Sequence, residues 1–365
     1  MLWFSAVGTP DKPDGNYNLE YVFAAAKEAA KYLPSGSIYV QKSTVPVGTG
    51  KQVAELLPRG VHYLSNPEFL RESTAVLDTL VFDRVVVDGS SQPAIDKLFA
   101  LHKSVEGHAE QIAHTSILVD YMEGIKHNAG KYIATSLESA ELTKVSANAF
   151  LAMKISFANS IAKLCDQTGA DITEVMRTVG KDQRIGGAFL NAGRGYGGGC
   201  FPKDVSGLIA SAQANKVDLS IMTATQAVNQ SMPGYIITKA SEEVGGFNNR
   251  TVAVLGLSFK AGTSDTRKSA GVRIANKLAE LGATVRAYDP EANKEAAPEL
   301  DRTVTLSNSA TDAVAAADVV FVATNWPEFT DVVSTLKDTT VVDCMNTYSS
   351  NQLQSSASYI GVGRD

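Results

Sequence analysis

Short runs of β-branched and aliphatic residues alternate with helical repeats in the first third of the chain. Strands are predicted at residues 2–7, 37–42, 61–64 and 84–88, with helices at 19–32 and 69–77. Such alternation predicts a parallel sheet covered by helices on both faces. In open sheets of this kind ligands bind at the carboxyl ends of the strands, where the segments 7–10, 43–49 and 65–68 follow.

The pattern then becomes helical, with apolar and small residues at helical spacing from Leu137 to Leu164 and no breaker before Gly169. A helix of roughly 30 residues is about 45 Å long. Because one small domain needs less, we expect this helix to span two domains and a subunit interface. Asp171 is predicted to cap a short following helix that ends at Gly180.

Strand and helix alternation resumes after residues 245–249, with strands predicted at 251–255, 283–288, 319–323 and 340–343 and a helix at 270–281. The predicted fold class is therefore α/β, with two Rossmann-like parallel-sheet domains joined by a central helical region. We place the first domain at residues 1–125, the central domain at 126–245 and the last at 246–365.

Composition narrows the partners of such a chain. Of its 365 residues 44% are hydrophobic and 20% charged, and its formal charge of −6 comes without a basic stripe, which argues against a nucleic acid partner. The sequence shows neither a membrane-spanning run nor a signal peptide. Three scattered cysteines favour a reducing cytoplasm. The five histidines lack metal-ligand spacing with one another or with the cysteines, so we predict no metal.

Cys200 is the strongest candidate for chemistry, because five glycines precede it between residues 193 and 199 and Phe-Pro-Lys-Asp follows. Glycines let a ligand approach the backbone closely. Lys203 favours the thiolate, and Asp204 can hold a lysine or a water. The alternative is a buried cysteine in a tight turn, the interpretation we keep for Cys165 and Cys344.

Three other segments carry candidate polar chemistry. Asn66-Pro67 predicts the start of a helix that places Glu68 and Glu72 on one face. The two carboxylates could activate water or bind a sugar, or they could simply form a solvated acidic face. Lys144 and Asn148 lie four residues apart on the long helix. They could form a polar pocket, or Lys144 could lie at the helix edge and extend its amine into solvent. Residues 257–267 follow a strand and open a helix, as phosphate-binding turns do.

One apparent nucleotide motif is rejected. Residues 193–198 read Gly-Arg-Gly-Tyr-Gly-Gly, which satisfies the letters G-x-G-x-x-G. A dinucleotide fingerprint follows a strand and is succeeded by an acidic strand end about twenty residues later. This segment has neither neighbour, and no other stretch of the chain supplies such a fingerprint.

Taken together, these segments resemble the UDP-glucose/GDP-mannose dehydrogenase family of nucleotide-sugar dehydrogenases, and its UDP-glucose branch most closely. The resemblance covers essentially the whole chain. The matching residues are 6–10, 43–49, 66–72, 141–144 with Asn148, 184–186 with 189–190, 195–204, 255–267, 287–290 and 326–329.

The resemblance implies an NAD domain, a helical dimerising centre and a UDP-sugar domain, and two NAD-linked oxidations that turn the C6 alcohol of UDP-glucose into a carboxylate. Cys200 is then the nucleophile that forms a thiohemiacetal and a thioester. Lys144 and Asn148 stabilise oxygen charge, Asp204 assists proton transfer, and Thr44 and Glu72 position the hydrolytic water.

The resemblance also implies the binding residues. Arg184 is expected to reach the partner subunit's site in a homodimer built on the long helix. The residues expected to bind the sugar nucleotide are Glu68, Phe69, Leu70, Arg71, Arg184, Phe189, Tyr196, Gly197, Gly198, Gly199, Phe259 and Lys260. Those expected to bind NAD are Val7, Gly8, Thr9, Pro10, Asp11, Thr44, Glu72, Lys203 and Arg267.

The chain departs from the family pattern in several places. Family members begin with a Gly-x-Gly-x-x-Gly strand-turn-helix. This chain starts where they have completed roughly 80 residues, or about two βα units of a dinucleotide fold. The first domain is therefore expected to be truncated. Asn191 stands where many relatives have lysine, Gly199 where serine is common, and Cys344-Met345-Asn346 where Gly-Arg-Asn is frequent. We therefore expect weak NAD binding, weak turnover by the chain alone, and weaker nucleotide binding or a narrower sugar range.

Two alternatives stay open. Within the enzyme class, the alternative substrate is GDP-mannose. The other is a non-catalytic nucleotide-sugar-binding or assembly subunit that borrows its missing strands from another polypeptide, because the strand at residues 2–7 would otherwise be an exposed sheet edge.

Overall fold

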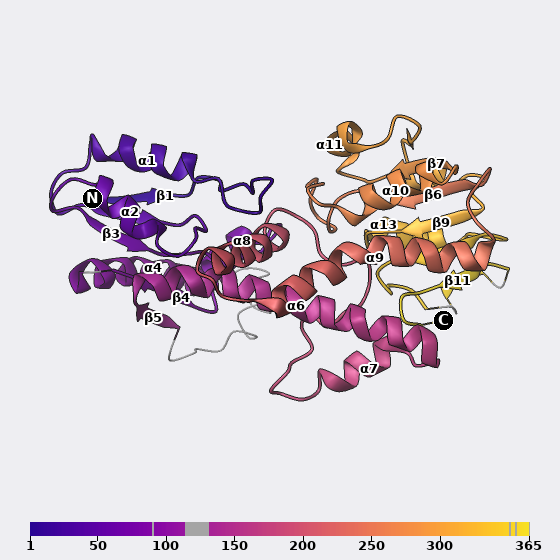
Figure 1. Cartoon of the computed structure of the whole chain (residues 1–365), viewed down its shortest axis with the longest axis horizontal. Helices are drawn as coiled ribbons and strands as arrows, with labels where there is room; N and C mark the ends of the chain where they lie inside the picture. The colour runs from indigo at the N-terminus through magenta and orange to yellow at the C-terminus, as the bar shows by residue number, and fades with distance from the viewer. Residues whose placement is uncertain (90, 114–130, 350–351, 355, 365) are drawn as a thin grey trace. The chain divides into compact units, whose positions relative to one another are not determined.

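The computed structural model describes residues 1–89, 91–113, 131–349, 352–354 and 356–364. The chain divides into two compact units (Figure 1). The first comprises Met1–Asn148 with Ser206–Asp218, and the second Ala149–Val205 with Leu219–Asp365. The predicted boundary between residues 125 and 126 lies outside the described residues, as do His114 and His127.

A parallel sheet forms the centre of the first unit, in the order β1-β2-β3. Strands β1 and β3 are its outer strands, and β4 and β5 form a separate parallel pair. Helices α1 and α2 cover one face of the sheet and α4 the other, because alternate strand residues are buried on opposite sides. The bounds are β1 Leu2–Ser5, α1 Glu20–Ala30, β2 Ile38–Gln41, α2 Thr49–Leu56, β3 His62–Ser65, β4 Val85–Asp88, α4 Gln92–Ala113 and β5 Tyr132–Thr135.

The helix predicted at residues 69–77 is wrong in its start. Helix α3 spans Ala75–Leu80, and residues 66–74 form a loop. The carboxylate of Asp78 accepts hydrogen bonds from the Arg71 backbone N–H and the Thr74 hydroxyl, and Ser73 has a φ of 76°. These bonds compete with a helical turn, so Glu68 and Glu72 do not share a helix face.

The predicted long helix is confirmed as α6, Leu137–Thr168, of 32 residues. It ends where Gly169 takes a φ of 72°. Asp171 caps α7, Ile172–Val179, by accepting from the Thr173 N–H, as predicted. Two further helices follow, α8 (Phe201–Ala214) and α9 (Ser220–Val244).

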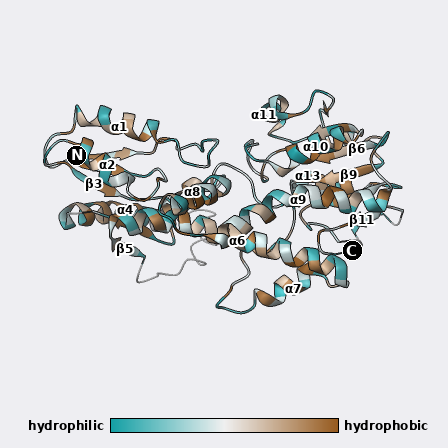
Figure 2. Ribbon diagram, in the orientation of Figure 1, coloured by the Kyte–Doolittle hydropathy of each residue, from teal (hydrophilic) through white to brown (hydrophobic). Residues whose placement is uncertain are grey.

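A parallel sheet ordered β11-β10-β9-β6-β7-β8 forms the centre of the second unit. Strands β6, β9 and β10 carry apolar runs (Figure 2), as strands buried on both faces do. Helices α6, α9 and α10 cover one face, and α12 and α13 the other. The bounds are β6 Thr251–Leu255, α10 Ala270–Glu280, β7 Thr284–Tyr288, α11 Asn293–Ala296, η1 Ala297–Glu299, β8 Thr305–Leu306, α12 Ala310–Val314, β9 Val319–Val322, α13 Pro327–Ser334, β10 Thr340–Asp343 and β11 Ser358–Ile360.

The strand order of the second sheet reverses between β6 and β9, because the chain continues outward from β6 to β7 and β8 and later from β9 to β10 and β11. In open α/β sheets, ligands bind outside the carboxyl ends of the strands at such a reversal. The predicted α/β class with parallel sheets and a central long helix is confirmed. Within the described part of the chain, no helix combines the length and apolarity needed to cross a membrane.

Candidate active site

The thiol of Cys200 lies at the start of α8 and is exposed, whereas Cys165 and Cys344 are buried. The Cys200 carbonyl accepts the Asp204 N–H at 2.9 Å, which forms the first turn of the helix. A helix N-terminus favours an anion such as a thiolate. As expected from the sequence, Asp204 holds a lysine: Lys203 Nζ lies 2.6 Å from its buried carboxylate.

Two asparagines that the sequence reasoning missed hold the glycine-rich loop before Cys200. Asn229 on α9 accepts from the Tyr196 N–H at 2.7 Å and donates to the Tyr196 carbonyl at 3.0 Å. Asn159 on α6 accepts from the Gly193 N–H at 2.7 Å. Both side chains are buried, and no sequence signal marks them, because their partners are backbone groups of a segment distant in the chain.

The glycines of this loop pack directly against the turn that follows β6. A Cβ on Gly198, whose φ is 79°, would lie 2.8 Å from the Phe259 ring, and one on Gly197 would lie 2.7 Å from the Lys268 carbonyl. A Cβ on Gly199 would lie 2.5 Å from the Arg267 guanidinium. The loop therefore requires glycine to approach this closely.

A buried carboxylate shapes the turn after β6. Asp289, at the end of β7, accepts from the backbone N–H groups of Leu257 and Ser258 at 2.8 and 2.9 Å and from Trp326 Nε1 at 3.1 Å. The turn thereby places Phe259 and Lys260 at the carboxyl end of β6, beside the point where the strand order reverses. This is the position of the phosphate-type turn predicted from the sequence.

A polar cluster follows β2 and β3 in the first unit. Lys144 on α6 is buried, and its Nζ lies 3.1 Å from Glu68 Oε1 and 5.4 Å from the Phe69 ring centre. Lys42 Nζ donates to Asn66 Oδ1 at 3.1 Å, which also lies 3.2 Å from His102 Nε2. Burial lowers the pKa of Lys42 to about 8. Lys42 was not predicted as a site residue, although its place at the end of a predicted strand was a usable signal.

The loop after β1 is tied to the loop that carries Thr44. Thr9 Oγ1 donates to the Thr44 carbonyl at 2.9 Å, and Ser43 Oγ donates to the Val7 carbonyl at 2.6 Å. Glu141 on α6 accepts the N–H groups of Gly48 and Gly50, both at 2.7 Å, and so caps α2. Burial raises the pKa of Glu141 to about 6, against the effect of these two hydrogen bonds.

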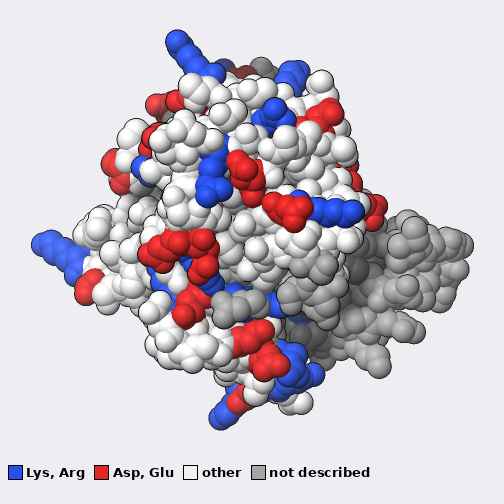
Figure 3. Space-filling view, turned by 90° about the vertical axis from the view of Figure 1, so that its right-hand side faces the viewer, with Lys and Arg blue, Asp and Glu red and all other residues white. Residues whose placement is uncertain are grey.

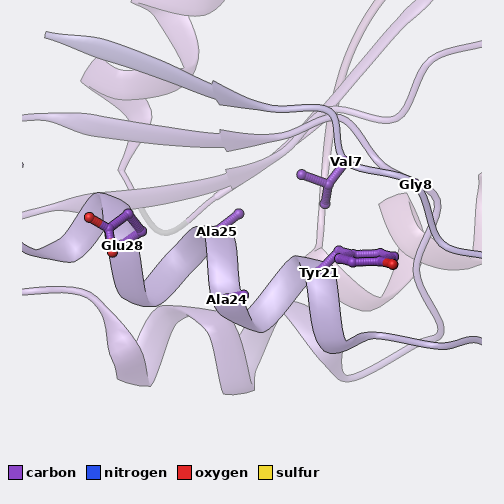
Figure 4. A pocket seen from close by; sticks show the side chains of 6 residues that line it. All are labelled: Val7, Gly8, Tyr21, Ala24, Ala25 and Glu28. Carbon is purple, nitrogen blue, oxygen red and sulfur yellow. The ribbon is translucent and has the colours of Figure 1, made fainter.

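A hollow of about 620 Å³ opens between the loop after β1 and helix α1 (Figure 4). Val7 and Gly8 line it from the loop, and Tyr21, Ala25 and Glu28 from the helix. Apart from Gly8 itself and its two chain neighbours, no described residue has a heavy atom within 4 Å of the place where a Cβ on Gly8 would be. Its volume lies in the range of small-molecule sites and its lining is largely apolar, but the hollow is wide open to solvent.

The other predicted residues have the following partners. Arg71 pairs with Asp78, and Arg84 lies 3.8 Å from the Phe69 ring centre. The exposed side chain of Arg184 pairs with Asp182 at 2.6 Å.

The predicted site residues fall in both units. Those in the first unit are Val7, Gly8, Thr9, Pro10, Asp11, Thr44, Glu68, Phe69, Leu70, Arg71, Glu72, Lys144 and Asn148. Those in the second are Arg184, Phe189, Tyr196, Gly197, Gly198, Gly199, Cys200, Lys203, Asp204, Phe259, Lys260 and Arg267.

Comparison with known families matches most of the chain. The NAD binding, central and UDP binding domains of the UDP-glucose/GDP-mannose dehydrogenase family match residues 1–106, 138–231 and 253–350. The chain belongs to this family. It is an NAD-dependent nucleotide-sugar dehydrogenase, and the UDP binding match covers the Phe259 turn and strands β7, β8, β9 and β10.

Relatives of this dehydrogenase include the UDP-glucose 6-dehydrogenase YwqF of Bacillus subtilis (strain 168), 36% identical over 99% of this chain and 80% of that protein. The UDP-glucose 6-dehydrogenase of Rhizobium meliloti (strain 1021) is 37% identical over 99% and 81%. A UDP-glucose dehydrogenase structure from Pyrobaculum islandicum has a TM-score of 0.83 at 34% identity, over 100% and 80%. These likenesses favour neither GDP-mannose as the substrate nor a non-catalytic subunit.

The first unit of the dehydrogenase fits part of a dinucleotide. The loops after β1 and β2 lie at the carboxyl ends of their strands, where such ligands bind, and Gly8 leaves open space beside the apolar hollow. Val7, Gly8, Thr9 and Pro10 are the residues suited to hold NAD there.

Acidic and basic side chains are interspersed over the described part of the face in Figure 3, as expected from the net charge of −6.

Proposed function

We propose that the chain oxidises UDP-glucose to UDP-glucuronate in two NAD-linked steps, with Cys200 as the covalent nucleophile. The observation that carries this proposal is an exposed thiol at a helix start, on a loop packed against the turn after β6. That turn belongs to the UDP binding match, and relatives at 36% and 37% identity are UDP-glucose 6-dehydrogenases.

The chemistry assigned to Cys200 follows from its nucleophilicity. NAD, when bound, accepts the hydride that leaves C6 in each oxidation. The Cys200 thiolate adds to the aldehyde carbon left by the first oxidation, and the thiohemiacetal becomes a thioester when the second hydride leaves. Water then cleaves the carbon–sulfur bond, which releases the carboxylate and restores the thiol.

The other proposed roles follow the positions of the side chains. Asp204, which pairs with Lys203, assists proton transfer. Lys144 and Asn148 donate hydrogen bonds to the substrate oxygen that gains negative charge. Thr44, whose loop Glu141 fixes, and Glu72 position the hydrolytic water. We keep the expected division into residues 1–125, 126–245 and 246–365 as part of this proposal.

The sugar nucleotide and NAD are proposed to bind the two residue sets expected from the family. In the second unit the sugar nucleotide meets the Tyr196–Gly199 loop with Phe259 and Lys260, and Arg184 serves a partner subunit's site. In the first unit it meets Glu68 and the three residues that follow it. NAD lies along residues 7–11, with Thr44, Glu72, Lys203 and Arg267 facing it.

We further propose a homodimer through α6. Four large apolar side chains on this helix are exposed at spacings of seven or eight residues, and they therefore share one face. They are Leu142, Phe150, Phe157 and Leu164, with exposed fractions of 45%, 57%, 50% and 59%. A contiguous apolar stripe on a surface typically marks an interface. Sedimentation should show a dimer that Phe150→Glu with Phe157→Glu dissociates and that Ile221→Glu, on α9, leaves intact.

The cytoplasmic location stays a prediction.

The proposed reaction is tested by its products. At excess NAD the purified chain should form two NADH for each UDP-glucuronate, and Cys200→Ser should form no UDP-glucuronate. Carboxylate formation that continues unchanged in Cys200→Ser would show that the nucleophile is wrong.

A further inference from the structure

A buried, positively charged side chain lies at the carboxyl edge of the second sheet. Arg194, in the glycine-rich loop before Cys200, is only 3% exposed. Its backbone N–H donates to the Cys344 carbonyl at 2.8 Å, which fixes the loop to the end of β10. The guanidinium is therefore held inside the unit, where a charge is expensive to desolvate.

The partners of this guanidinium are neutral. Nη2 donates to the Phe259 carbonyl at 2.7 Å and lies 3.4 Å from Thr324 Oγ1, and Nε lies 3.1 Å from Met345 Sδ. Nη1 is buried and has no hydrogen-bond partner among the described residues. Burial lowers the pKa of Arg194 to about 10, and the acidic groups that oppose this effect are Cys344 and Asp289.

Asp289 is a poor counter-ion for this charge. Its Oδ2 already accepts from two backbone N–H groups, the Ser258 hydroxyl and Trp326 Nε1. Cys344 is fully buried, and burial raises the pKa of its thiol, so it stays neutral. A positive charge of this kind is normally neutralised, because an uncompensated buried ion is strongly destabilising.

The position of Arg194 indicates what neutralises it. Phe259 follows β6 and Thr324 follows β9, the two strands between which the strand order reverses. An α/β sheet binds its ligand at this reversal. Gly256, directly after β6, packs closely against the residue that follows β9, since its φ is 102° and a Cβ there would lie 2.5 Å from the Thr324 side chain.

We propose that Arg194 is the positive charge that recognises the diphosphate of the nucleotide bound at this reversal point. The inference rests on the proposed function and adds a specificity-determining residue to it. The guanidinium acts from beneath the site through its charge, because a buried charge interacts strongly with an anion a few ångströms away. A neutral nucleoside gains nothing from it.

The test compares UDP with uridine, which lacks the diphosphate. NMR titrations of the full chain should show that Arg194→Met weakens UDP binding by about tenfold or more while uridine binding changes by less than about twofold. Arg194→Lys, which keeps a positive charge, should retain most of the UDP affinity. Arg286→Met is the matched control, because Arg286 also donates to a backbone carbonyl in this unit, that of Ala315.

Each outcome decides the matter. Equal losses for UDP and uridine in Arg194→Met would show a structural role and overturn the inference, and so would unchanged UDP affinity. If Arg194→Met does not fold, Arg194→Lys decides: a tenfold or greater loss of UDP affinity in this variant, which keeps the positive charge, would overturn the proposal. Failure of the unchanged chain to bind UDP would refute the proposed function together with this inference.

Discussion

Replacing Asp88 by asparagine separates the charge of a buried carboxyl group from its hydrogen bond. Asp88 ends β4, is 2% exposed, and accepts the Ser65 N–H at the end of β3. It thus joins β4 to the strand that leads into the Glu68 loop. The oxygen of asparagine can accept the same hydrogen bond, so the substitution removes mainly the charge.

Burial raises the pKa of Asp88 from 3.8 to about 7, with a smaller contribution from the negative charges of Glu141 and Glu138. One pKa unit corresponds to about 1.4 kcal/mol, so the charged form costs the folded state about 4 kcal/mol. The folded state keeps its proton between about pH 4 and pH 7, where the unfolded chain has lost it. The stability contributed by Asp88 therefore falls as pH rises through this range.

The expected result is that Asp88→Asn stabilises the folded chain by an amount that increases with pH. Its free energy of unfolding should match that of the unchanged chain near pH 4 and exceed it by about 2 to 4 kcal/mol above pH 7. The chain has two tryptophans, Trp3 in the first unit and Trp326 in the second. Urea unfolding followed by Trp3 fluorescence in a Trp326→Phe background measures the first unit.

Asp83→Asn is the control, because the Asp83 side chain is 75% exposed. It should change stability by less than about 0.5 kcal/mol at every pH. An Asp88→Asn variant that is less stable than the unchanged chain at pH 8, or whose difference does not vary with pH, would refute the reasoning.

Three further predictions concern the loops of the candidate active site. Iodoacetamide should label Cys200 alone in the folded chain, because the other two thiols are buried; mass spectrometry that found either of them labelled as fast would contradict this. Gly198→Ala should weaken UDP binding by about tenfold or more, since its Cβ meets the Phe259 ring, whereas Gly234→Ala, with open space around it, should leave titrations unchanged. Glu141→Gln should speed hydrogen exchange at the amides of Gly48 and Gly50, because the glutamine side chain offers one acceptor oxygen where the carboxylate offers two. Unchanged exchange would show that the cap is not needed.

The parts of the fold that depend on local pattern were predictable. Strands β6 and β10 have the predicted bounds, because each is a short apolar run between polar or glycine residues. The long helix α6 was predicted from Leu137 onward, because its periodicity is unbroken until Gly169. Its last turn extends beyond the predicted Leu164.

The start of α3 was not predictable from local pattern. Asn66-Pro67 is typical of a helix start, yet Asn66 Nδ2 donates to the Val86 carbonyl at 2.8 Å. Asp78 binds the Arg71 N–H, which a helix would have used otherwise. These partners are fixed by tertiary structure and by a side chain several residues away, and a sequence pattern contains neither.

The same limit applies to the candidate active site. The sequence identifies Cys200 and the glycines around it, because their residue types are unusual together. It does not identify Asn229 or Asn159, whose roles depend on which backbone groups lie opposite them. Arg194 belongs to the same class, since its importance arises from a burial that its loop sequence does not reveal.

The capture of the nucleotide-sugar aldehyde by Cys200 is central to the proposed function and can be tested without NAD. The rate at which iodoacetamide labels Cys200 is determined by mass spectrometry in the presence of UDP-glucose or of its C6 aldehyde, each at a saturating concentration. We predict that the aldehyde slows labelling much more than UDP-glucose, because it occupies the sulfur as a thiohemiacetal. Equal protection by the two ligands would contradict the assignment of Cys200 as the nucleophile.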